Sequence, residues 1–79
     1  MNKTRPYQVY QYFRDQAGLT DYKVSQQSGI STAVLAQWKR GEYNLKLDKL
    51  QKLARVFSIP VQVFYDERIQ YRFQEEAQA

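Results

Sequence analysis

The reactive chemistry open to this chain is narrow, because two of the residue types that most often perform it are missing. The 79 residues include no histidine and no cysteine. This excludes the commonest general base and metal ligand, and also disulfides and thiolate zinc sites. The acidic pairs Asp66–Glu67 and Glu75–Glu76 are sequence neighbours, which favours solvated side chains over a catalytic pair. We therefore expect no enzyme, no catalytic residue, no metal and no cofactor.

The remaining chemistry is electrostatic, and its sign changes along the chain. Twelve Lys and Arg residues against eight Asp and Glu residues give a net charge of +4. Residues 1–65 hold ten basic and four acidic side chains, a local net charge of +6. Residues 66–79 hold two basic and four acidic ones, a local net charge of −2. A basic body with a mildly acidic tail is typical of a polyanion-binding module whose tail faces away from its ligand.

Length and composition limit the architecture that positions these charges. Seventy-nine residues can form one domain with a single small core. Hydrophobic residues make up 43% of the chain and aromatic residues 15%, too many for a disordered segment. No apolar run approaches the roughly 18 residues of a membrane span, and the polar start Met1–Thr4 is unlike a signal peptide. We expect a cytoplasmic globular domain over residues 1–65, without a membrane partner or an evident small-molecule ligand, followed by a tail over 66–79.

Apolar residues recur at helical spacing, and no segment shows the alternation typical of a strand. The expected helices begin at Pro6, Asp21, Thr32, Leu47 and Val61, with Thr20 and Ser31 as N-caps and Gly18, Gly29 and Gly41 as C-terminal breaks. The tail continues the pattern, because Tyr65, Ile69 and Phe73 are spaced by four residues. The sequence thus predicts an all-α fold of five helices, with a tail that is a candidate helical extension.

The segment Asp21–Arg40 carries the most specific pattern, two short helices joined by a tight turn. Gly29 suits the positive φ of such a turn, and Ser25 is small enough for a close helix crossing. At 100° per residue, one face of the second helix carries Val34, Leu35 and Trp38 and the opposite face carries Thr32, Ala33, Ala36, Gln37 and Arg40. The first face should pack into the core, with Trp38 buried rather than stacked on a base. The second face is then presented outward, in the geometry of a helix that enters the major groove of DNA.

These residues resemble the phage repressor/Cro-type helix-turn-helix regulators, also called the XRE family. The run LTDYKVSQQSGISTAVLAQWKRGEYNLKLDKLQKLARVFSIPVQVF is similar to the family from Leu19 to Phe64 without a gap, and the first helix fits as well. The amino-acid sequence at Tyr22–Ser25 and Lys46–Ala54 is most similar to that of prophage-type regulators of Gram-positive bacteria. The resemblance implies a repressor-like fold and a double-stranded DNA ligand.

The resemblance also assigns roles to individual positions. It implies base contacts by Thr32, Ala33, Ala36 and Gln37, and phosphate contacts by Ser31, Lys39, Arg40, Tyr43, Asn44 and Lys46. Among them Gln37 is the best suited to recognise a base, because its amide can form hydrogen bonds with N7 and N6 of one adenine at the same time. Asp21 departs from the pattern: several members have a phosphate-binding glutamine there, whereas a carboxylate suits the helix dipole but repels DNA.

The sequence therefore predicts a sequence-specific transcriptional regulator, a repressor, that acts as a homodimer. One recognition helix reads only about 4–5 base pairs, so two half-sites are needed for useful specificity. The expected dimer surface comprises Phe64, Tyr65, Ile69 and Phe73. Alternatively, the apolar tail residues Tyr65, Ile69 and Phe73 can fold back onto the first helix near Tyr7 and Tyr10. An antitoxin or anti-repressor that grips a protein partner with the same fold is the alternative from another class, and RNA binding lacks a recognisable motif.

Overall fold

The computed structural model describes residues 6–66, and this part of the chain contains helices and no strand. The elements are α1 (Pro6–Gln16), α2 (Asp21–Ser28), α3 (Thr32–Lys39), α4 (Leu47–Phe57) and the 3-10 helix η1 (Val61–Phe64). The predicted all-α fold is confirmed. No helix among the described residues is long and apolar enough to cross a membrane. The tail residues Ile69 and Phe73 lie outside the described residues.

The fifth expected helix is a single 3-10 turn, so the count of five α-helices is corrected to four. Pro60 starts this turn in an extended conformation, and its carbonyl accepts from the Val63 N–H at 3.1 Å. The Tyr65 N–H bonds the Gln62 carbonyl at 3.0 Å. Both bonds span three residues, which defines the tighter helix and limits it to a short piece.

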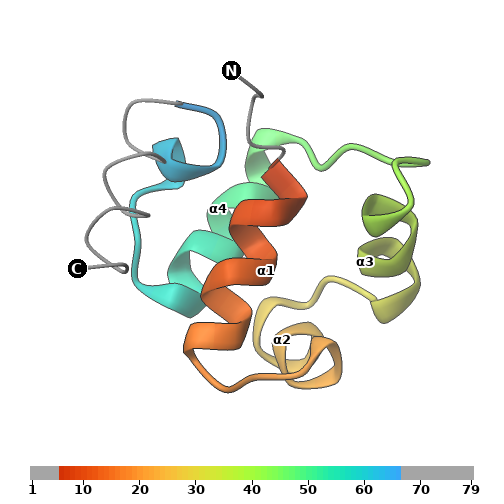
Figure 1. Ribbon diagram of the computed structural model, residues 1–79, viewed down its shortest axis with the longest axis horizontal. Helices are drawn as coiled ribbons and strands as arrows, with labels where there is room; N and C mark the ends of the chain where they lie inside the picture. The colour runs from red at the N-terminus through yellow and green to blue at the C-terminus, as the bar shows by residue number, and fades with distance from the viewer. Residues whose placement is uncertain (1–5, 67–79) are drawn as a thin grey trace.

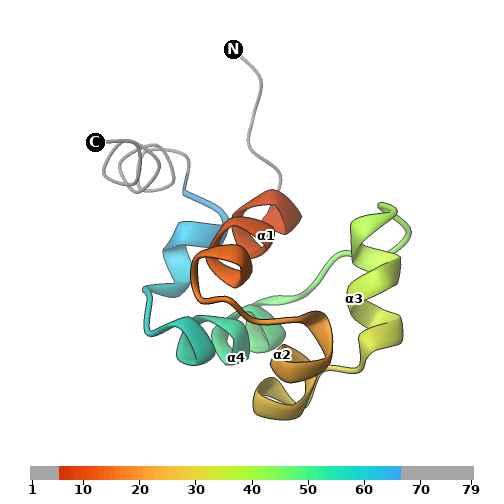
Figure 2. The same ribbon diagram turned by 60° about the horizontal axis from the view of Figure 1, so that its bottom comes forward.

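The helices surround one core, with α3 set to one side. Figure 1 shows α1 lying across α4, with α2 below it and α3 at the opposite side of the molecule from η1. The same separation of α3 from η1 is visible in the turned view of Figure 2. The buried apolar side chains come from every element: Tyr7, Val9, Tyr10, Val24, Ile30, Leu35, Trp38, Leu45, Leu50, Leu53, Ala54, Val63 and Phe64. This core holds α3 by one face only.

Local signals determine where α2 and α3 begin and where α2 ends. The Thr20 hydroxyl accepts from the Lys23 N–H, and the Ser31 hydroxyl accepts from the Val34 N–H, both at 3.2 Å. Each hydroxyl thereby satisfies one of the free N–H groups of a helix start. Gly29 lies between the two helices with a φ of 80°, a conformation that a side chain would disfavour. The predicted N-caps and the glycine turn are confirmed.

The Phe64 side chain is fully buried in the chain's own core. We expected it on a dimer surface, and that expectation is corrected, because a side chain at 0% exposure has no area left for a partner. Its neighbour Tyr65 is 55% exposed. The 3-10 turn accounts for the difference, since it directs Val63 and Phe64 inward and leaves Tyr65 at the surface.

Candidate nucleic-acid interface

The two faces of α3 have opposite environments. Leu35 and Trp38 are buried, and the Trp38 ring meets those of Tyr7 and Tyr10 at centroid distances of 5.3 and 5.5 Å. On the other face Thr32, Ala33, Gln37 and Arg40 are exposed and Ala36 is half-buried. Aromatic packing thus fixes α3 through its buried face, and the opposite face is exposed to solvent over two turns.

Most of the residues expected to contact phosphates lie around the two ends of α3. Ser31 precedes the helix, Lys39 and Arg40 end it, and Asn44 and Lys46 follow in the loop; all five are exposed. Leu45 is buried within that loop and anchors it to the core. The polar side chains of the loop are therefore held close to the C-terminal end of α3.

Arg40 is paired in the free protein. Its Nη2 lies 3.1 Å from Oε2 of Glu42, and both side chains are more than half exposed. The hydrogen bond and charge of Arg40 lower the pKa of Glu42 below its ordinary value. Because solvent screens this pair, a phosphate can compete with Glu42 for the guanidinium.

Tyr43 is half-buried, and its hydroxyl accepts a hydrogen bond of 3.2 Å from the Lys49 ammonium. The same ammonium lies 5.1 Å from the centre of the Tyr43 ring. Lys49 belongs to the first turn of α4. The structure brings it to the loop after α3, beside the residues proposed to bind phosphate. The contact between Lys49 and Tyr43 could not be predicted from the sequence, because it depends on the path of the loop between α3 and α4.

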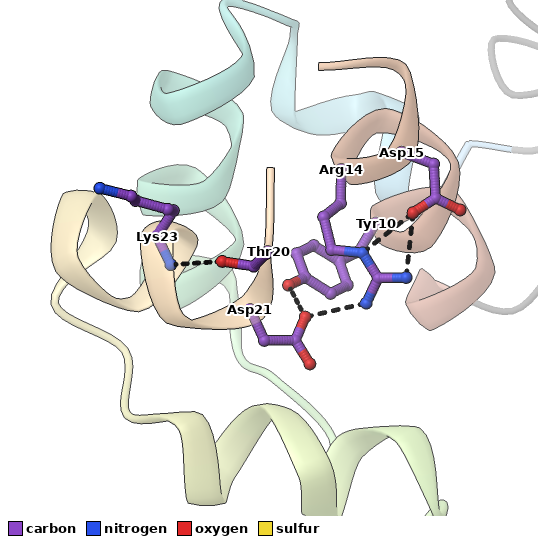
Figure 3. Close-up of polar contacts among 6 residues, drawn as sticks. All are labelled: Tyr10, Arg14, Asp15, Thr20, Asp21 and Lys23. Atoms are coloured by element: carbon purple, nitrogen blue, oxygen red, sulfur yellow. Dashed lines mark hydrogen bonds and ion pairs between the residues drawn. The ribbon is translucent and has the colours of Figure 1, made fainter. Parts of the chain in front are cut away.

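A second polar cluster joins α1 to the start of α2 (Figure 3). The Tyr10 hydroxyl donates to Oδ1 of Asp21, and Nη1 of Arg14 donates to the same oxygen at 2.9 Å. Arg14 also donates to Oδ1 of Asp15, from Nε at 3.1 Å and from Nη2 at 3.0 Å. Its guanidinium carbon lies 5.6 Å from the centre of the Tyr10 ring.

The cluster keeps Asp21 ionised. Partial burial favours the neutral acid, but the hydrogen bonds from Tyr10 and Arg14 and the positive charges of Arg14 and Lys39 outweigh it and lower the pKa of Asp21. Burial, followed by the Asp21 carboxylate, raises the pKa of Tyr10, so its hydroxyl remains a donor. The position where the resemblance suggests a phosphate-binding glutamine is thus occupied by a charged, internally bonded carboxylate.

The family comparison agrees with this geometry. Residues 11–64, more than half of the chain, match the model of the helix-turn-helix family. The chain belongs to this helix-turn-helix family. The Cro-type (XRE) helix-turn-helix that the resemblance indicated is confirmed, and the protein is a DNA-binding helix-turn-helix regulator of transcription. No curated protein matches the sequence significantly. The helix-turn-helix pair corresponds to α2 and α3, which makes the outer face of α3 the candidate DNA-reading surface.

Proposed function

We propose that this helix-turn-helix protein is a sequence-specific repressor that inserts α3 into the major groove of double-stranded DNA as a homodimer and catalyses no reaction. The observation that carries the proposal is the division of α3 into a buried face and an exposed face. Leu35 and Trp38 fix the helix against the core, and Thr32, Ala33 and Gln37 remain at the surface. A rigidly held helix with a free polar face is what base reading requires.

The exposed side chains suit a division of labour between base and phosphate contacts. Gln37 can bond an adenine edge with both atoms of its amide, while Ala33 and Ala36 offer apolar contact to a thymine methyl. Arg40, Asn44 and Lys46 surround the end of the helix and can bond phosphates. Such contacts fix the position of the protein and add affinity that depends on salt.

We propose that the dimer uses the tail. Tyr65 is exposed where the described chain ends, and Ile69 and Phe73 continue its four-residue spacing. The experiment is sedimentation analysis of the full chain and of a version ending at Asp66. The full chain should sediment as a dimer and the shortened chain as a monomer. Equal masses for the two would exclude Ile69 and Phe73 from the dimer contact.

Selection of bound duplexes from a random library tests the function as a whole. The proposal predicts enrichment of a short motif that occurs twice, about 10–10.5 base pairs apart from centre to centre. Recovery of the starting library without enrichment would refute sequence-specific binding and favour a protein partner instead.

Gln37→Ala should weaken binding to the selected duplex by about 1–3 kcal/mol and remove the preference at one base pair of each half-site. The reason is the loss of a two-point amide contact, with little effect on a fold that Gln37 does not support. Fluorescence titration against duplexes changed at single positions measures both effects. Unaltered preference at every position would show that Gln37 does not read the sequence.

Arg40→Ala should weaken specific and random duplexes alike, and lower the magnitude of the salt slope of log Kd by about one. The physical reason is the loss of one phosphate contact and of the counterion release that accompanies it. Lys52→Ala, an exposed lysine on α4, is the matched control and should leave the slope unchanged. A slope that Arg40→Ala does not alter would remove Arg40 from the phosphate contacts.

A further inference from the structure

Arg14 is a cation held on three sides by its own protein. Asp21 and Asp15 accept its hydrogen bonds at 2.9–3.1 Å, and the Tyr10 ring lies beneath it. The Arg14 side chain is only 18% exposed, whereas the paired side chain of Arg40 is 55% exposed. The hydrogen bonds of the Arg14 guanidinium at 2.9–3.1 Å all go to these two carboxylates, and a phosphate would have to displace one of them to bond the guanidinium.

The cluster lies beside the DNA-reading surface. Asp21 is the first residue of α2, and the charge of Lys39 at the end of α3 acts on its carboxylate. Lys39 follows Ala36 by three residues and Thr32 by seven, so these three side chains share one row of the helix. Figure 3 shows α3 passing below Asp21 and the guanidinium of Arg14, with Asp15 on the far side of the guanidinium. Of the two carboxylates that bond Arg14, Asp21 is therefore the one on the side of α3.

We propose that Asp21 limits the affinity of this protein for all DNA by holding the Arg14 guanidinium in an internal ion pair, away from the phosphates. The inference rests on the proposed function. The carboxylate also cancels the attraction of the N-terminus of α2 for an anion. A phosphate contact adds affinity without sequence information, so its removal lowers specific and non-specific binding together. Asp21 is thus a positioning residue for Arg14 that sets overall affinity and leaves base preference unchanged.

Asp21→Asn is the decisive variant, because it removes the charge and keeps an oxygen that can accept from Tyr10. We expect binding to the selected duplex and to a random duplex to tighten by about three- to tenfold at 0.1 M salt. The magnitude of the salt slope should rise by about 0.9, the contribution of one additional phosphate contact. Asp21→Glu, which keeps the charge, should retain the affinity of the unchanged protein.

Asp15→Asn is the matched control. It removes the same charge from the same guanidinium, but on the side away from α3, and should change affinity by less than twofold. Arg14→Gln should by itself leave affinity within twofold, because the guanidinium is already withheld. Combined with Asp21→Asn, it should abolish most of the gain, since the freed cation is then absent. Melting curves followed by Trp38 fluorescence establish that each variant is folded at the temperature of the titrations.

The outcomes separate this inference from the proposed function. Failure of the unchanged protein to bind any duplex would refute the proposed function, and the inference with it. Normal binding with Asp21→Asn unchanged in affinity and slope would refute the inference alone. An equal gain in affinity from Asp15→Asn would also refute the inference, because it would indicate a general charge effect. An altered base preference in Asp21→Asn would refute it as well, because it would indicate a shifted α3. If Asp21→Asn does not fold, a loss of affinity and slope in Arg14→Gln would refute the inference, and unchanged values would support it.

Discussion

Trp38→Ala should destabilise the domain by about 3–5 kcal/mol, the usual cost of truncating a large aromatic side chain in a core. Trp38 is 2% exposed and packs edge-on against Tyr7 and tilted against Tyr10, so no solvent can replace the lost contacts. Total stabilities of 5–15 kcal/mol are typical of small domains, and a loss of this size leaves a substantial fraction unfolded. Urea unfolding followed by far-UV circular dichroism measures the change without the tryptophan signal.

Gln37→Ala is the control for this prediction, because Gln37 is the preceding residue and lies on the exposed face of the same helix. Its effect on stability should stay within about 0.5 kcal/mol. The two variants should therefore distinguish an effect on folding from an effect on base recognition. Trp38→Ala should lose DNA binding because the domain unfolds, and Gln37→Ala should lose its base-pair preference while remaining folded. A Trp38→Ala variant that unfolds at the same urea concentration as the unchanged protein would contradict the inward assignment.

Phe64→Ala should cost a similar amount, about 3–5 kcal/mol. The Phe64 side chain has no exposed area and fills the space beside α1 and α4 that the 3-10 turn closes. The stability of a protein kept too dilute to associate is the quantity to measure, since any effect there arises within one chain. This condition distinguishes a core residue from an interface residue.

Tyr65→Ala provides the matched comparison for Phe64. Tyr65 is adjacent in sequence and more than half exposed, so its loss should change the stability of the dilute protein by less than about 1 kcal/mol. If instead Phe64→Ala melted normally and altered only the sedimentation mass, Phe64 would return to the dimer surface.

Features with local causes could be predicted from the sequence. The starts of α2 and α3 depend on one hydroxyl each, and the turn between them depends on a glycine at positive φ. The inward direction of Trp38 follows from its spacing to Leu35, because residues three apart share a helix face. These relations span four residues or fewer, and the structure confirms them.

Features that depend on tertiary packing could not be predicted from the sequence. Phe64 and Tyr65 are adjacent aromatic residues, and only the short 3-10 turn determines which of them is buried. The Tyr10–Asp21 hydrogen bond joins residues eleven apart on two different helices, so no local sequence pattern predicts it. The sequence did show Asp21 as a departure from the family's pattern, but the Arg14 partner that explains it becomes visible only when α1 and α2 are in place.

The central claim is that the outer face of α3 lies in the major groove, and a cysteine-tethered DNA-cleaving reagent tests it most directly. The chain has no cysteine, so Ala33→Cys on α3 or Gln62→Cys on η1 supplies the only attachment point. Both positions are exposed. The elements that carry them, α3 and η1, lie on opposite sides of the molecule in Figures 1 and 2. On the selected duplex, Ala33→Cys should give one focused cluster of cuts within each half-site, and Gln62→Cys should give none there. Focused cleavage from Gln62→Cys, with none from Ala33→Cys, would contradict the assignment of α3 as the reading helix.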